Sequence, residues 1–112
     1  MYTYNATCDR VVDGDTVDCI IDLGFSILFK QRVRLLGIDA WESRTRDKEE
    51  KVKGIAAKER VEELLAEHNN KFVLKTELDK KGKYGRVLGV IYLNDVNMNE
   101  LLIEEGHARP YE

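Results

Sequence analysis

Three short segments concentrate the side chains of this chain that could do chemistry. Residues 13–16 place a carboxylate just after a turn, and residues 34–42 hold an arginine and two carboxylates. In residues 83–86, two basic side chains flank a tyrosine and a glycine. Carboxylates bind hard cations or take a proton from water, and guanidinium groups bind phosphate through paired hydrogen bonds. These residue types therefore favour the binding of a cation and of a phosphate group.

Each segment taken alone also has a structural explanation. Asp13-Gly14 is a common hairpin turn, because Asp and Gly tolerate positive φ angles, although Asp15 is surplus to such a turn. Residues 34–42 could be a salt-bridged strand end, and residues 83–86 a solvated turn. The chemical interpretation therefore depends on the order and content of all three segments together.

Five strands and two helices are predicted to position these segments. Stretches rich in Val, Ile, Thr and Tyr, bounded by turn residues, predict strands at residues 2–12, 16–21, 27–38, 72–78 and 86–93. Apolar residues at helical spacing predict a helix that a capping box of Asp47 and Glu50 opens and Asn69-Asn70 ends. Asn97 is expected to cap a second, short helix near the C-terminus.

This order of elements predicts an OB-fold in a mainly β protein with helices. The fold is a five-stranded Greek-key β-barrel with a helix between strands 3 and 4, here followed by a short C-terminal helix. Asp39 and Glu42 come just after the strand that carries Arg34, so all three are expected at one rim of the barrel. The 112 residues suit a single domain, residues 1–112. An SH3-like barrel and an open α+β sheet are the alternatives.

The acidic surplus of the chain is confined to its first third. The net charge is −3, and residues 1–42 hold seven acidic and four basic side chains, whereas the rest of the chain is balanced. Clustered carboxylates repel one another unless a cation lies among them. A bound divalent ion would explain the surplus, and so would carboxylates on separate solvated faces.

The sequence as given points to a cytoplasmic protein without a membrane segment. It has no apolar stretch near the roughly 20 residues that span a bilayer, and residues 1–8 lack the features of a signal peptide. A secreted mature form with a start Met added would look the same. Cys8 and Cys19 fall on strands expected to pair, and we interpret them as small buried apolar residues without a disulfide.

The order and content of the three segments resemble the staphylococcal nuclease (thermonuclease) family. The resemblance runs over nearly the whole chain, from about Tyr4 to Tyr111. Its matching pieces are residues 12–17, residues 34–39 with Glu42, residues 83–89, and residues 98–102 with Gly106. The resemblance implies an OB-fold that cleaves phosphodiester bonds of DNA and RNA with one calcium ion, for which magnesium or manganese are alternatives.

The resemblance also implies a role for individual residues. Asp15 and Asp39 match the carboxylates that bind calcium, and the backbone carbonyl of Ala40 matches a further ligand. Glu42 matches the general base toward the attacking water. The two arginines that grip the scissile phosphate correspond to Arg34 and Arg86. Contacts with a bound nucleotide are implied for Lys83, Tyr84 and Tyr111.

The sequence departs from the family pattern beside the expected base. Ala40-Trp41 replaces the usual Thr-Pro, which frees the backbone of the loop that leads to Glu42. Trp41 is expected either to stack on a base of the substrate or to pack against residues 43–51. The connection between residues 16 and 34 is also longer than in the best-known members, and the chain ends at Glu112 without their C-terminal helix.

Two further classes of function compete with a metal-dependent nuclease. One is a non-catalytic nuclease-like domain that binds nucleic acid or protein, and the other is a calcium-stabilised structural module. Non-catalytic relatives characteristically lose the acidic ligands or the arginines, whereas this chain keeps all of them, which favours the enzyme. Preference for DNA or RNA is left open, and both a monomer and a homodimer fit the sequence.

Overall fold

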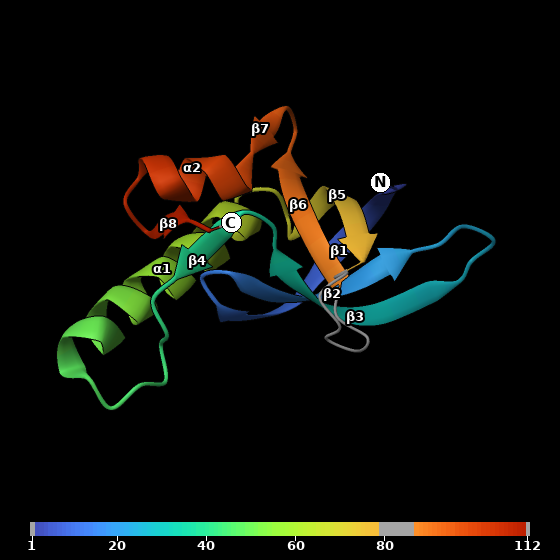
Figure 1. The fold of residues 1–112 in the computed structure, drawn as a ribbon. Coiled ribbons are helices and arrows are strands. Elements are labelled where there is room, and N and C mark those ends of the chain that lie inside the picture. Colours follow the sequence, from blue (N-terminus) through green and yellow to red (C-terminus); the bar gives the residue numbers. More distant parts are fainter. Residues whose placement is uncertain (1, 79–86, 112) are drawn as a thin grey trace.

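The computed structural model describes residues 2–78 and 87–111, which form eight strands and two helices (Figure 1). In chain order these elements are β1 (Tyr2–Asp13), β2 (Thr16–Asp22), β3 (Leu28–Leu35), β4 (Ile38–Ala40), α1 (Lys48–Ala66), β5 (Lys71–Leu78), β6 (Val87–Leu93), β7 (Val96–Asn97), α2 (Met98–Glu104) and β8 (Ala108–Pro110).

Strands β1, β2, β3, β5 and β6 close into a barrel. The first half of β1 pairs with β5 and its second half with β2, while β2 pairs with β3 and β5 with β6, all antiparallel. A parallel pairing of β3 with β6, from Val33↔Val87 to Leu35↔Gly89, closes the ring. Because α1 lies between the third and the fourth barrel strand, the prediction of an OB-fold is confirmed.

The prediction of one long third strand over residues 27–38 is wrong. The strand ends at Leu35, and Gly37 turns the chain with a φ of 80°, a conformation that residues with a side chain rarely adopt. The next strand, β4, then pairs with β8 in a separate two-stranded sheet. Asp39 therefore reaches the barrel rim from a second sheet and not from the end of β3.

Both helices begin at the predicted capping residues. The side chain of Asp47 accepts hydrogen bonds from the amides two and three residues further on, at 3.0 and 3.2 Å. Asn97 does the same for α2 with the amide of Glu100, at 3.1 Å. Asn69 and Asn70 follow α1 with φ angles of 56° and 60°, which ends the helix where the sequence predicts.

The core fills the barrel and the space under both helices. Its largest fully buried side chains are Val17, Cys19, Val33, Leu35, Ile38, Val61, Leu65, Leu74, Ile91, Met98 and Leu102. Val52 and Ile55 belong to the apolar spacing of α1 but are exposed, because the start of the helix extends past the barrel (Figure 1). Only the second half of α1 therefore contributes large apolar side chains to the core.

Cys8 and Cys19 face each other as partners in the ladder between β1 and β2, as their strand assignment predicts, and both are free thiols. Burial raises the pKa of the Cys8 thiol to about 11 and that of Cys19 to about 12. Both thiols are therefore protonated at neutral pH. In the part of the chain that the structure describes, no helix has the length and apolar character to span a membrane.

Candidate active site

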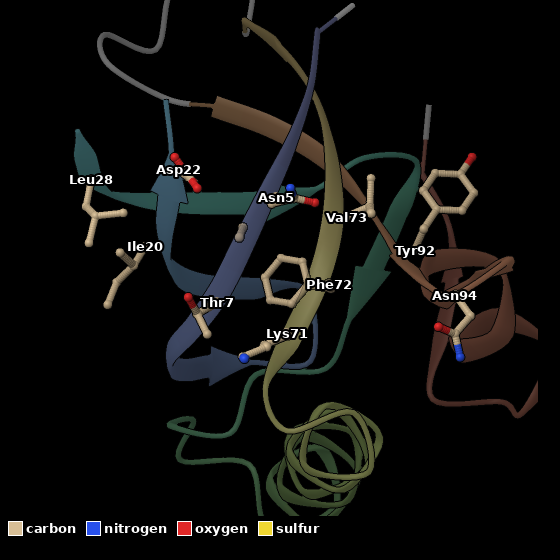
Figure 2. A pocket seen from close by; sticks show the side chains of 11 residues that line it. Asn5, Thr7, Ile20, Asp22, Leu28, Lys71, Phe72, Val73, Tyr92 and Asn94 are labelled. Carbon is tan, nitrogen blue, oxygen red and sulfur yellow. The ribbon is translucent and has the colours of Figure 1, made fainter. Parts of the chain in front are cut away.

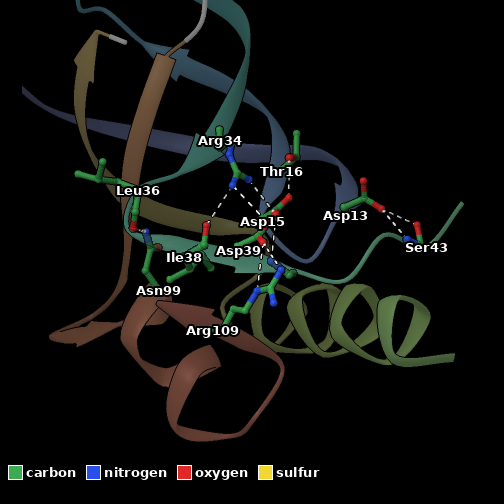
Figure 3. A network of polar contacts seen from close by, with 11 residues as sticks. Asp13, Asp15, Thr16, Arg34, Leu36, Ile38, Asp39, Ser43, Asn99 and Arg109 are labelled. Carbon is green, nitrogen blue, oxygen red and sulfur yellow. Dashed lines mark hydrogen bonds and ion pairs between the residues drawn. The ribbon is translucent and has the colours of Figure 1, made fainter. Parts of the chain in front are cut away.

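The first two of the predicted segments meet at one end of the barrel (Figure 3). Asp15 lies in the turn between β1 and β2, Arg34 near the end of β3, and Asp39 in β4. Nη1 of Arg34 lies 2.8 Å from Oδ2 of Asp15, and its Nη2 lies 3.5 Å from Oδ1 of Asp39. Nη2 also donates a hydrogen bond to the carbonyl of Ile38 at 3.2 Å. One guanidinium thus joins the barrel to the second sheet.

A polar pocket of about 360 Å³, here called the carboxylate pocket, surrounds this ion pair. Six of the predicted site residues line it, together with Asp13 and Thr16: Asp15, Arg34, Asp39, Ala40, Glu42 and Tyr111. The fold therefore brings these six residues together from four separate parts of the chain.

The charges in the carboxylate pocket are paired to different degrees. The side chains of Asp15 and Arg34 are 10% and 17% exposed, and charges this far from water need a partner. Asp39 also binds Arg109, whose Nη2 and Nε lie 3.1 and 3.3 Å from its Oδ2. Glu42 is exposed. Carboxylates therefore outnumber arginines around the pocket, which favours a further cation there.

The sequence did not point to Arg109 as a site residue. It did predict Tyr111, but not its contact with Arg34. Arg109 faces Asp39 because β8 pairs with β4, and a pairing between three-residue strands leaves little trace in the sequence. The ring of Tyr111 lies 5.3 Å from Cζ of Arg34, within the range of a cation–π contact. The segment after α2 therefore forms one wall of the carboxylate pocket.

Glu42 is held through its backbone and its neighbour. Ser43 donates two hydrogen bonds to Oδ1 of Asp13, from its hydroxyl at 2.5 Å and from its amide at 3.2 Å. On the other side, a Cβ added to Gly54 of α1 would overlap the carbonyl group of Glu42 and lie 2.7 Å from the amide of Ser43. These contacts fix the loop in which Ala40-Trp41 stands in place of the family's usual Thr-Pro. Asp13 is the residue that anchors this loop.

Gly14 owes its place to close packing and not to a positive φ. A turn joins β1 and β2 at the predicted place, but its two residues are Gly14 and Asp15 and not Asp13 and Gly14, and Gly14 is absent from the positive-φ glycines of the described chain. A Cβ at this position would lie 2.8 Å from Cβ of Ala57 and 3.0 Å from Cβ of Ala40. Small residues on α1 and β4 therefore let the turn approach closely enough to place Asp15 beside Arg34.

Asn99 supports the turn between β3 and β4, which leads to the carboxylate pocket. It is buried, and its amide group donates to the carbonyls of Leu36 and Gly89 at 2.9 and 3.1 Å, while its oxygen accepts from the amide of Ile91 at 3.2 Å. These bonds tie the chain just before Gly37 to β6 (Figure 3). A buried amide with its polar atoms satisfied rigidifies its surroundings, so Asn99 fixes the turn that aims β4 at the pocket.

For Trp41 the sequence predicts either stacking on a substrate base or packing against residues 43–51. Trp41 is half-buried, and Nζ of Lys53 lies 5.1 Å from the centre of its ring. This cation–π partner comes from α1, just beyond residues 43–51. Stacking of Trp41 on a substrate base stays a prediction.

The metal ligands predicted from the sequence have the chemistry for a hard divalent cation. Asp15 and Asp39 converge on one positive group, and carboxylate oxygens are the ligands that calcium prefers. Among the described residues, no group of three Cys, His, Asp or Glu side chains could hold a metal ion. A cation would therefore need a backbone carbonyl and water as well. Ala40 donates its amide to Asp15 Oδ2 at 3.0 Å, and the role of its carbonyl stays a prediction.

The third segment, residues 83–86, lies outside the described residues. Lys83, Tyr84 and Arg86 all lie outside the described residues, which end at Leu78 and resume at Val87. Their predicted contacts with the nucleotide and with the scissile phosphate therefore stay predictions from the resemblance.

A closed five-stranded barrel with a helix between its third and fourth strands defines the class of this protein as an OB-fold. The family model described as "Staphylococcal nuclease homologue" matches residues 32–112. The chain belongs to this family, as the sequence predicts.

Named relatives agree with the family match. The chain is 34% identical to Endonuclease YncB of Bacillus subtilis, over 94% of the chain and 47% of that protein. It is 36% identical to Thermonuclease of Staphylococcus intermedius, over 89% of the chain and 55% of that protein. An uncharacterized protein of Methanocaldococcus jannaschii is 34% identical over 91% of the chain and 56% of its own length. The chain thus spans about half the length of these relatives.

Proposed function

We propose that this protein is a metal-dependent nuclease that hydrolyses phosphodiester bonds of DNA or RNA in the carboxylate pocket. The observation that carries the proposal is the convergence of Asp15 and Asp39 on Arg34, with Glu42 lining the same pocket. Relatives named endonuclease and thermonuclease over nearly the whole chain support the same reaction class.

In this proposal Glu42 is the general base. Its carboxylate takes a proton from a water molecule, whose oxygen then bonds to phosphorus while one ester P–O bond breaks; the leaving oxygen takes a proton from solvent, and Glu42 afterwards releases its own proton to solvent. A base must reach its water freely, and the exposed position of Glu42 at the pocket is suited to that. The anchoring of the loop by Asp13 and Gly54 holds the carboxylate near the reacting group.

Arg34 is proposed to hold the scissile phosphate. A guanidinium offers paired donors to the phosphoryl oxygens, and charge that grows on these oxygens is stabilised by preorganised cations. Asp15, Asp39 and the ring of Tyr111 hold Arg34 in place before substrate binds. From the resemblance, Arg86 would be a second phosphate ligand.

Asp15 and Asp39, with the carbonyl of Ala40, are the residues that would hold the metal ion. We propose calcium, with magnesium or manganese as alternatives. When bound, such an ion supplies charge stabilisation to the phosphoryl oxygens. The surplus of carboxylates around the pocket is consistent with this cation.

Nucleotide contacts complete the proposal. Tyr111 lines the pocket beside Arg34, so a bound nucleotide would meet its ring. Lys83 and Tyr84 are proposed from the resemblance to contact a further phosphate, and Trp41 to stack on a base. A non-catalytic domain that only binds nucleic acid is the second candidate, and the presence of all the acidic and basic site residues counts against it.

A cleavage assay separates the two candidates. Labelled single-stranded and plasmid DNA and RNA are incubated with wild-type protein in calcium, magnesium, manganese or a chelator. We expect cleavage with at least one metal, none with the chelator, and a loss of roughly 10²–10³ in rate for Glu42→Gln. Lys51→Gln, on the exposed face of α1, is the control with unchanged rate.

Two results would overturn the proposal. Binding of nucleic acid without cleavage in any metal would assign the protein to the second candidate. Cleavage that Glu42→Gln leaves unchanged would move the reaction away from the carboxylate pocket.

A further inference from the structure

The hairpin of β2 and β3 ends in an exposed apolar tip, defined here as residues 23–29. It projects to the side of the barrel opposite α1 and α2 (Figure 1). Phe25 is 99% exposed, and Leu28 and Ile27 are 67% and 54% exposed. Leu23 and Phe29 are exposed as well. So many neighbouring apolar side chains in water mark an interaction surface.

The tip holds Phe25 in a backbone conformation that does not suit it. The amide of Ile27 donates to the carbonyl of Gly24 at 2.9 Å, which makes Phe25 and Ser26 the central residues of a tight turn. Their φ angles are 54° and 63°. Turns of this kind favour Asn-Gly, and a bulky residue at positive φ is rare. A phenylalanine at this strained position is consistent with a role outside the turn.

A row of positive charges leads from the carboxylate pocket toward this tip. Side chains alternate along β3, so Lys30, Arg32 and Arg34 lie on its outer face while Val33 and Leu35 are in the core. The pairing of β2 with β3 has no register shift, so the alternation is unbroken. Each step of two residues advances about 7 Å along the strand. Successive cations at such a step suit successive phosphates of an extended strand.

The carboxylates of β2 do not cancel the positive charge of this row. Asp18 lies between Arg32, at 2.8 Å, and Arg10, at 3.8 Å, so the three together keep one positive charge. The Arg32 guanidinium lowers the pKa of Asp18, as expected for a carboxylate beside a cation. Asp22 accepts a hydrogen bond from the amide of Gly24 at 2.8 Å and keeps its negative charge, so Arg10, Lys30 and Arg32 exceed the carboxylates of Asp18 and Asp22 by one positive charge.

A hollow of about 390 Å³ is lined by residues of the hairpin, of β1 and of β5 and β6, whose side chains Figure 2 shows. Ile20, Leu28 and the carboxylate of Asp22 line it from the hairpin, and Phe72, Tyr92 and Lys71 from β5 and β6. Ile20 is the ladder partner of Lys30, so the hollow borders the positive row. Apolar and aromatic walls next to cations suit a nucleotide, with the phosphate on the cations and the base or sugar on the apolar surface.

We propose that the outer face of β3 and the hairpin tip form a binding track for a single-stranded stretch of the substrate, beyond the bond that is cleaved. Lys30 and Arg32 bind its phosphates, and Phe25 stacks on an unpaired base. This inference rests on the proposed nuclease function. Exposed aromatic rings favour single strands, whose base faces are free. The row ends inside a pocket, which a flexible strand can enter and a membrane surface cannot.

The test measures binding of a labelled long single-stranded oligonucleotide in chelator, by fluorescence anisotropy at several salt concentrations. We expect Phe25→Ser to weaken binding roughly 5-fold or more, which is the lower limit for loss of one stacked base. Lys30→Gln should lower the slope of log K against log salt by about 0.7, which corresponds to one phosphate contact on a single strand. Val52→Ser and Lys51→Gln, exposed on α1, are the matched controls with unchanged affinity.

A second variant separates binding from folding. Phe25→Asn combined with Ser26→Gly supplies the residues that the turn favours, so Tm should be equal or higher. The same variant should still bind the long strand several-fold more weakly. A lower Tm with unchanged affinity would mean that Phe25 serves the fold alone, and would overturn the proposal.

Substrate length and type decide the remaining outcomes. Cleavage of a dinucleotide at the wild-type rate by all tip variants, with weaker binding of the long strand, supports the track. If wild-type protein cleaves but the tip variants bind long single strands normally, the track fails and the nuclease stands. If nothing is cleaved in any metal but the tip variants lose affinity, the nuclease fails and the track stands. Effects on vesicle binding or on self-association in place of strand binding would also overturn the track.

Discussion

At one end of the β2–β3 hairpin the side chains of Asp15 and Arg34 bind each other and are 10% and 17% exposed, whereas at the other end Phe25 is 99% exposed. The two ends belong to one ladder with an unbroken register between β2 and β3. At the pocket end, β4, β8 and α1 surround the charged groups. At the tip end, the hairpin extends past the rest of the barrel (Figure 1).

This difference shows two ways of using one hairpin. Charge stabilisation of a reacting group needs donors fixed in advance, and the pocket end has such donors. Retention of a long flexible substrate tolerates variation in position, because stacking and phosphate contacts depend little on sequence or exact register. We therefore propose that the chemical step takes place at the pocket end and that the tip end provides affinity for long substrate.

The largest expected effect contrasts two arginines of β3. Arg34→Lys keeps the charge but loses the fork that binds Asp15 and Asp39, so cleavage of a dinucleotide should fall roughly 10²-fold. Arg32→Lys, two residues along the same face, should leave dinucleotide cleavage unchanged. Single-turnover rates measure both variants. Equal losses in the two would contradict the separate roles of pocket and track.

The next effect concerns the loop that carries Glu42. Gly54→Ala would push a methyl group into the carbonyl of Glu42 and should slow cleavage by about 10- to 100-fold through displacement of the base. Alanine is intrinsically better in helices than glycine by about 1 kcal/mol. A variant with faster or unchanged cleavage and a higher Tm would show that Gly54 does not position Glu42. Ile55→Ala, at the next position on α1, is the control.

The smallest effect concerns stability at the pocket end. Nε and Nη2 of Arg60 lie 2.7 and 2.9 Å from the carboxylate of Glu105, which ties α1 to the segment that leads into β8. The Arg60 guanidinium lowers the pKa of Glu105. The contribution of the Arg60–Glu105 ion pair to folding stability is therefore present above the ordinary Glu pKa of 4.5. It is lost as the pH falls through the lowered pKa of Glu105.

Arg60→Gln should accordingly reduce Tm by a few degrees at most at pH 7, because the pair is close to solvent. The difference from wild type should shrink below about pH 4. Thermal unfolding followed by circular dichroism at several pH values measures this. A difference that persists unchanged in acid would mean that Arg60 acts through packing and not through its charge.

The fold was predictable where the signal is local. Asp47 and Asn97 cap the two helices as expected, and the apolar pattern locates the barrel strands. The break at Gly37 was not predicted, because β4 forms by pairing with β8, about 70 residues further along the chain. Short strands that pair over such a distance have no periodicity of their own.

The candidate site was predictable only as a list of residues. Motif content located Asp15, Arg34 and Asp39, and the fold brings them together. Their supporting contacts were not predictable, since Arg109 approaches through β8 and Ser43 binds Asp13 across the loop. Such contacts depend on geometry between elements, which a single sequence does not specify.

One kinetic experiment tests the division between the two ends directly. Single-turnover cleavage of a long single strand is measured against protein concentration for wild type, Arg34→Lys and Phe25→Ser. We expect Arg34→Lys to lower the rate at saturation, whereas Phe25→Ser should only raise the half-saturating protein concentration. A lower saturating rate in Phe25→Ser, or an Arg34→Lys variant that differs from wild type in half-saturation alone, would contradict it.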